Sequence, residues 1–153
     1  MLFILAFLIG GVAGLRAMVA PAAVSWAAHL GWLPLQDSAL AFLGYAWTPW
    51  IFTIMALGEL VTDQLPATPS RTVPAQFGAR IVSGALCGAA IGATGGSLVG
   101  GLVAGVIGAV VGTLGGAAVR GRLSAAFGSD RPAALIEDAV AIIGAWLIVQ
   151  AVL

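Results

Sequence analysis

The chain has 153 residues, of which 61% are hydrophobic and only 8% charged, and its mean hydropathy is +1.10. This apolar share excludes an ordinary soluble domain and predicts a single integral-membrane domain, residues 1–153, with the lipid bilayer as its partner. Six arginines balance six carboxylates and lysine is absent, so no nucleic-acid partner is indicated. The single cysteine, Cys87, excludes an internal disulfide, and no Cys/His pattern predicts a metal site or a cofactor.

The fold class predicted is all-α, a polytopic helical bundle. Apolar runs of about 20 residues predict five spans, near residues 2–30, 38–63, 75–93, 97–119 and 132–153. No basic residue precedes the first run, so we interpret it as a retained membrane helix and not as a signal peptide. Glycines and Pro21 interrupt this run around Arg16, which leaves open whether residues 2–30 form one long helix or a broken pair.

The second span is also irregular. Thr48 and Pro49 form a typical N-cap and first-turn pair. A helix beginning there has about 15 residues before Gln64, roughly 22 Å at 1.5 Å per residue, which is short for a hydrocarbon core of about 30 Å. Short or broken spans indicate a transporter-type site, because irregular backbone at membrane depth must line a cavity or be buried in protein.

The arginines predict the sidedness of the chain. The loops near residues 64–74 and 120–131 contain Arg71, Arg120, Arg122 and Arg131, whereas those near 31–37 and 94–96 contain none. The positive-inside rule therefore places the first two loops in the cytoplasm. With five spans, the N-terminus is then predicted to be cytoplasmic and the C-terminus outside. Trp32, Tyr45, Trp47 and Trp50 gather on the predicted exterior side, as in an interfacial aromatic belt.

Glycines recur about every four residues in the third and fourth spans. They are Gly84, Gly88, Gly92, Gly96, Gly100, Gly101, Gly105, Gly108, Gly112 and Gly116. Helix faces made of such small residues let helix backbones approach closely. We expect a glycine zipper either between these two spans or between chains, in a homo-oligomer or with a membrane-protein partner. The alternative is a pore lined by glycine backbone.

Most carboxylates lie inside the predicted spans. Glu59 and Asp63 are four residues apart on one helix face, at a helix C-terminus, where the dipole disfavours negative charge and a cation must offset it. Glu137 and Asp138 fall in the first turns of the last span, where they are either helix-capping residues or functional ones. No catalytic or metal-binding residue is predicted among them.

Arg16 and Arg80 are the cations available inside the spans. Because ionisable groups in a membrane are costly and usually pair inside the protein, we expect Arg80 and the four carboxylates to form one polar cluster in the cytoplasmic half, with Arg16 above it. The cluster is interpreted as a site for a substrate or a proton. The alternative is a structural salt-bridge network that fixes helix register.

The loop PATPSRTVP, residues 66–74, is predicted to cover this cluster. Its prolines remove amide donors, while Thr68, Ser70, Arg71 and Thr72 offer hydroxyls and a guanidinium suited to an anion. A tight prolyl turn without a ligand is the alternative.

Three segments carry a resemblance to a known family. They are the run ELVTDQLPATPSRTVP, continuing to Arg80 and Gly84, and the C-terminal LIEDAVAI; GLRAMVAPAAVSWAAHLGWLP fits as well. The chain resembles small bacterial inner-membrane proteins known only as a domain of unknown function, in which lysine is more common at the position of Gln64. The resemblance implies a compact polytopic protein of the bacterial inner membrane, without indicating an activity.

Two function classes remain open. A small transporter or channel, proton-coupled or anion-binding, would use the intramembrane carboxylates, the arginines and the broken helices. A non-transporting accessory or assembly subunit would use the glycine faces, with the charged cluster as a structural network. Catalysis is not favoured, because the only histidine, His29, is predicted at the exterior end of the first span, away from every carboxylate.

Overall fold

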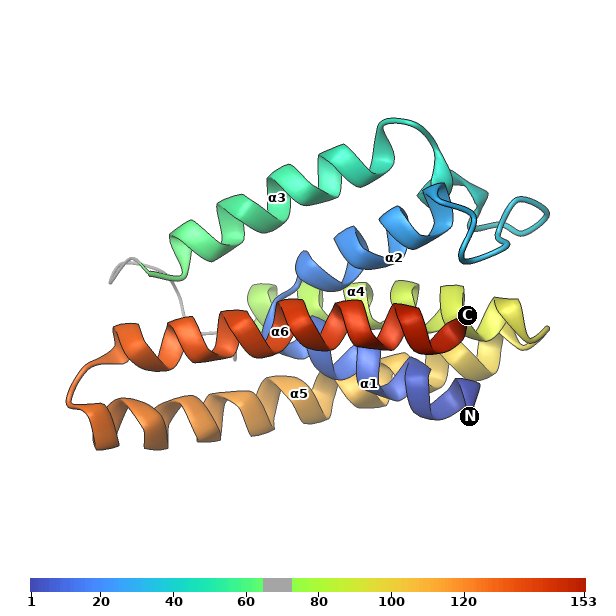
Figure 1. Cartoon of the computed structure of the whole chain (residues 1–153). Helices are drawn as coiled ribbons and strands as arrows, with labels where there is room; N and C mark the ends of the chain where they lie inside the picture. Colours follow the sequence, from blue (N-terminus) through green and yellow to red (C-terminus); the bar gives the residue numbers. More distant parts are fainter. Residues whose placement is uncertain (65–72) are drawn as a thin grey trace.

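The computed structural model describes residues 1–64 and 73–153. The helices, in chain order, are α1 (Leu2–Leu15), α2 (Val19–His29), the 3-10 helix η1 (Ala41–Gly44), α3 (Thr48–Thr62), α4 (Pro74–Thr94), α5 (Leu98–Phe127) and α6 (Asp130–Val152) (Figure 1). The described residues contain no strand, which confirms the all-α prediction. Helices α4, α5 and α6 are long and apolar enough to cross a membrane, whereas α1 and α3 are shorter apolar helices.

The first predicted span is a broken pair that reverses its direction. Helix α1 ends at Leu15, and Arg16 has extended backbone (φ −140°, ψ 114°). Helix α2 then returns toward the end of the bundle from which α1 entered (Figure 1). At 1.5 Å per residue, α1 is about 21 Å long and α2 about 16 Å, so neither crosses a core of about 30 Å. The two helices form a re-entrant hairpin, residues 2–29.

Both chain termini lie at the same end of the bundle (Figure 1). The sequence prediction counted residues 2–30 as a single crossing and so placed the termini on opposite sides; which side of a membrane each terminus faces stays a prediction. We call this the terminal end. The opposite end carries Arg120, Arg122 and Arg131, around the turn from α5 to α6, and we call it the arginine-rich end (Figure 1).

Helices α1, α4 and α5 pack with their backbones in direct contact. Helix α5 makes its most extensive contacts with α1 and α4. A Cβ added to Gly14 would lie 2.6 Å from the carbonyl oxygen of Ala109, and one added to Gly84 would lie 2.7 Å from that of Gly105. A Cβ added to Gly88 would meet the backbone of α5 as well. These helices can approach so closely only because no side chain stands between them.

Helix α3 stands apart from that group. It begins at Thr48, with Pro49 in its first turn, and its 15 residues confirm the predicted short helix. It packs mainly against α2 and η1, and it slopes away from α6 (Figure 1). One polar contact with α2 is the hydrogen bond that Trp26 Nε1 donates to Thr53 Oγ1, 2.8 Å long.

Candidate functional site

The side chain of Arg16 is the centre of a buried ionic cluster. It has no exposed surface, and it lies where the re-entrant hairpin reverses. Its Nη1 is 2.7 Å from Asp63 Oδ2 and 2.8 Å from Glu137 Oε1, while its Nη2 is 2.6 Å from Asp138 Oδ1. Thus one guanidinium from the hairpin joins the C-terminal end of α3 to α6. We call Arg16, Glu59, Asp63, Arg80, Glu137 and Asp138 the Arg16 cluster.

Two arginines donate hydrogen bonds to the carbonyl groups at the C-terminal end of α1. The last carbonyls of a helix have no intrahelical donor and carry its negative partial charge. Arg80 Nη1 donates to the carbonyls of Gly14 (3.0 Å) and Leu15 (2.7 Å), and Arg16 Nη1 also donates to Leu15 at 2.9 Å. The two guanidinium groups thereby stabilise the end of α1 inside the bundle.

A carboxylate accepts hydrogen bonds from the free N–H groups at the N-terminal end of α2. The backbone N–H groups of Ala17 and Met18 donate to the two carboxylate oxygens of Glu59, at 2.7 and 2.8 Å. Negative charge is favoured at this helix end, where unpaired N–H groups and the dipole coincide. Glu59 Oε1 also lies 3.9 Å from Arg80 Nη2. The reversal is therefore held from α3 by an anion and from α4 by a cation.

The Arg16 cluster is nearly closed to solvent. The side chains of Asp63, Glu137 and Asp138 are 12%, 7% and 13% exposed. Desolvating such charges costs several kcal/mol per ion, which close pairing and additional hydrogen bonds must offset. Three carboxylates share the guanidinium of Arg16, so each depends on the same cation. A change in the charge of one carboxylate would therefore alter the balance of the whole cluster.

All six intramembrane residues singled out in the sequence come together here. Two details differ from the prediction. Arg16 is at the centre of the cluster and not above it. Helix α6 begins at Asp130, so Glu137 and Asp138 lie beyond its first turn and contact Arg16, and the capping interpretation is wrong. Whether the cluster binds a substrate or a proton stays a prediction.

Several residues of this region were not predicted. Ser83 Oγ donates to the carbonyl of Ala17 at 2.5 Å, and Thr113 Oγ1 donates to Ala109 at 2.7 Å and approaches Gly14 at 3.4 Å. Ser83 could have been found, since it lies three residues after Arg80 on the same face of α4. Thr113 gives no such signal, because it is a lone hydroxyl in a glycine-rich helix.

Gln64 also contacts the cluster, since its Nε2 lies 3.3 Å from Asp138 Oδ2. The predicted anion-binding residues Thr68, Ser70, Arg71 and Thr72 lie outside the described residues. His29 is exposed, with its Nδ1 3.1 Å from the Gly44 carbonyl and away from the Arg16 cluster. Within residues 1–64 and 73–153, no group of three His, Cys, Asp or Glu is placed to hold a metal ion.

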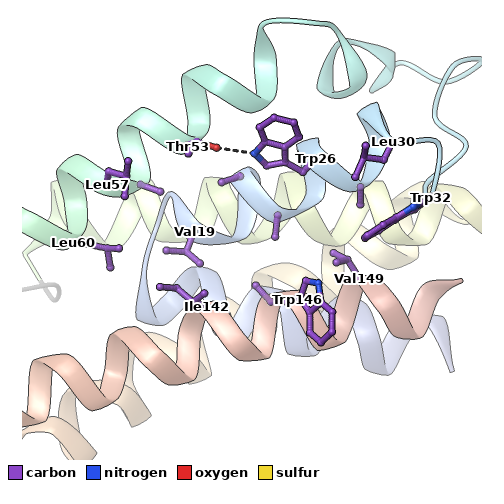
Figure 2. Close-up of a pocket in the computed structure, with 15 residues that line it drawn as sticks. Val19, Trp26, Leu30, Trp32, Thr53, Leu57, Leu60, Ile142, Trp146 and Val149 are labelled. Carbon is purple, nitrogen blue, oxygen red and sulfur yellow. Dashed lines mark hydrogen bonds between the residues drawn. The ribbon is translucent and has the colours of Figure 1, made fainter.

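An apolar cavity adjoins the cluster between α2, α3 and α6 (Figure 2). Its volume is about 450 Å³, and its lining includes Val19, Leu60 and Ile142. Val19 directly follows Met18, and Leu60 directly follows Glu59. The cavity is thus lined by sequence neighbours of residues that hold the ionic cluster, while the six residues of the Arg16 cluster do not line it. Among its lining residues, Trp26 and Thr53 satisfy each other by the hydrogen bond drawn in Figure 2.

Comparison with known proteins decides the family. The family described as "Domain of unknown function (DUF4126)" matches residues 3–152. The chain belongs to the DUF4126 family. The Arg16 cluster, the glycine contacts and the cavity all fall inside the matched residues, and the resemblance to an uncharacterised family is confirmed. No curated protein and no solved structure matches the chain.

Proposed function

We propose that this DUF4126 protein is a small membrane transporter in which protonation of the Arg16 cluster releases α3. The observation that carries the proposal is the way α3 is attached. Its C-terminal end is tied to the bundle through Glu59 and Asp63, while the apolar cavity separates its middle from α6. A helix joined by ion pairs at one end and flanked by a cavity is suited to move as a unit.

The re-entrant hairpin supports a transport role. Non-helical backbone at membrane depth is tolerated only where protein buries it or where it lines a cavity. In secondary transporters, the ends of discontinuous helices face the substrate and ion sites near the bilayer midplane. The backbone between α1 and α2 has this character, because Arg80 and Glu59 supply the partners that water or a substrate would otherwise provide.

Two proton-acceptor groups connect the cluster to α3. Protonation of Asp63 removes its negative charge and so weakens its ion pair with Arg16. Protonation of Glu59 weakens the hydrogen bonds from Ala17 and Met18, because a charged acceptor binds about twice as strongly as a neutral one. Both changes free the C-terminal end of α3, while Arg16 stays paired with Glu137 and Asp138.

The test is a flux measurement with purified protein in liposomes loaded with a pH-sensitive dye. A potassium diffusion potential drives proton entry at a series of external pH values. We expect flux above that of protein-free liposomes, rising as the pH falls. Asp63→Asn mimics the protonated side chain and removes this pH dependence. Asp37→Asn, the same change in an exposed loop at the terminal end, is the control and keeps it. Identical profiles for all three proteins would contradict the proposal.

The low solvent exposure of the Arg16 cluster favours a second function. Because its carboxylates are at most 13% exposed and lie against Arg16 or Arg80, the network also suits an accessory subunit that assembles with a membrane partner. In that case a well-packed apolar replacement of the ion pairs would preserve assembly. The Arg16→Met, Asp63→Leu, Glu137→Leu, Asp138→Leu quadruple variant distinguishes the two, because it leaves no carboxylate partner of Arg16 without its cation. An accessory subunit would still co-purify in fixed ratio with a partner, whereas a transporter would lose flux.

A further inference from the structure

A second apolar groove runs along the outside of the bundle, between α1, α5 and α6. It has a volume of about 470 Å³. Its lining includes Leu8 and Val12 of α1, Val111 and Val119 of α5, and Ile136 and Val140 of α6. Along α5 the groove extends from Val111 to Leu123, about 18 Å at 1.5 Å per residue. That length is close to half of the hydrocarbon core, about 15 Å. The groove thus has the length of one acyl chain in one leaflet.

A glycine keeps part of the groove open. Gly115 lines it, and a Cβ added to Gly115 would meet no atom within 4 Å. In contrast, a Cβ added to Gly112, one turn earlier, would touch the backbone of Gly11. Gly115 is therefore not needed for close packing within the chain. The space beside it is available to a molecule from outside.

The mouth of the groove carries positive charge. Arg120 lines its arginine-rich end, and its Nη2 is 2.7 Å from Asp130 Oδ2. Arg122 and Arg131 nearby are exposed, and in the described parts of the chain neither forms an ion pair. Residues 120–131 thus contain three arginines and a single carboxylate. Glu137, the acidic residue of the lining, is already engaged by Arg16 at 2.8 Å.

We propose that this groove binds an anionic phospholipid of the surrounding bilayer. One acyl chain lies along α5 beside Gly115, and the phosphate contacts Arg122 and Arg131. An apolar groove of leaflet length whose end is lined by Arg120, with the exposed Arg122 two residues later and Arg131 just after the turn, matches an acyl chain attached to an anionic headgroup. The positive-inside rule assigns this lipid to the cytoplasmic leaflet. The site does not depend on the transport proposal.

Thermal unfolding in detergent micelles tests the headgroup. Phosphatidylglycerol and phosphatidylcholine with identical acyl chains are added at a series of concentrations, and the shift of Tm gives an apparent affinity for each, since a ligand of the native state raises Tm. We expect tighter binding of phosphatidylglycerol. Replacing either Arg122 or Arg131 by glutamine should reduce this preference about fivefold.

A matched pair of variants tests the groove itself. Gly115→Leu adds a side chain whose Cβ meets no protein atom within 4 Å, and by occupying the groove it should abolish the response to phosphatidylglycerol. Gly121→Leu is the control on the same helix, because a Cβ added there also meets nothing within 4 Å and Gly121 does not line the groove. It should leave the response unchanged.

Photo-cross-linking locates the bound acyl chain in the wild-type protein and so adds a test that needs no variant. Phosphatidylglycerol with a photoreactive acyl chain should label the lining residues of α5 and α6. Equal affinity for the two lipids, labelling confined to the cavity of Figure 2, or a Gly115→Leu variant that still responds would overturn the proposal. It would also be overturned if Gly115→Leu changed the oligomeric state and not the lipid response, because a second chain would then occupy the groove.

Discussion

At the residue scale, the Arg16 side chain determines the local structure. Its guanidinium contacts three carboxylates from two helices, and it also donates to the last carbonyl of its own helix. Burying this charge is costly, and the cost is recovered only while all of these partners are in place. The planar, multidentate guanidinium suits such a position better than the point charge of lysine.

Arg16→Met should lower the free energy of unfolding by about 3–5 kcal/mol, because it leaves buried carboxylates without their cation. Arg16→Lys should recover only part of this loss, since one ammonium cannot reach all three carboxylates. Thermal unfolding in a fixed detergent measures both variants. Arg131→Met, which removes an exposed arginine, is the control and should leave Tm unchanged in lipid-free micelles. An equal loss in the control would contradict the assigned role of Arg16.

At the element scale, close backbone packing explains the glycine content of α5. A Cβ added to Gly105 would meet the backbone of α4 at Gly84 and Gly88. In contrast, Gly115 of the same helix faces open space. The two glycines look alike in the sequence, and their different surroundings give opposite expectations for the same substitution.

Gly105→Ala should destabilise the protein by about 1–3 kcal/mol, since the added methyl group forces α4 and α5 apart. Gly115→Ala should instead stabilise it by up to about 1 kcal/mol, because alanine is the better helix former. Unfolding of both variants by heat or denaturant in the same detergent gives the comparison. Equal effects of the two substitutions would mean that α4 and α5 do not touch at Gly105.

At the scale of the whole molecule, the re-entrant hairpin sets the position of the termini. Both termini and the turn between α4 and α5 lie at the terminal end, opposite the arginine-rich end (Figure 1). From this arrangement we expect the two termini on one side of the membrane and the turn between α5 and α6 on the other.

Protease-cleavable tags at the N- and C-termini should be cut from the same side of sealed vesicles. A cysteine placed in the turn by Ser129→Cys should react with an impermeant maleimide from the opposite side. Cys87 is fully buried and adds no background. Tags cut from opposite sides would mean that residues 2–29 cross the membrane as one span.

The sequence by itself determined the membrane class, the all-α fold and the composition of the ionic cluster. Charges are so costly in a bilayer that Arg16 and Arg80 had to meet the carboxylates. It could not determine the path of residues 2–30, because an apolar segment interrupted by glycines, Arg16 and Pro21 suits one long helix and a hairpin equally well. The tertiary structure decided this: Glu59 from α3 and Arg80 from α4 satisfy the free helix ends at the reversal. Likewise, only the packing of α1 and α4 distinguished the glycines that touch backbone from Gly115, which faces the groove.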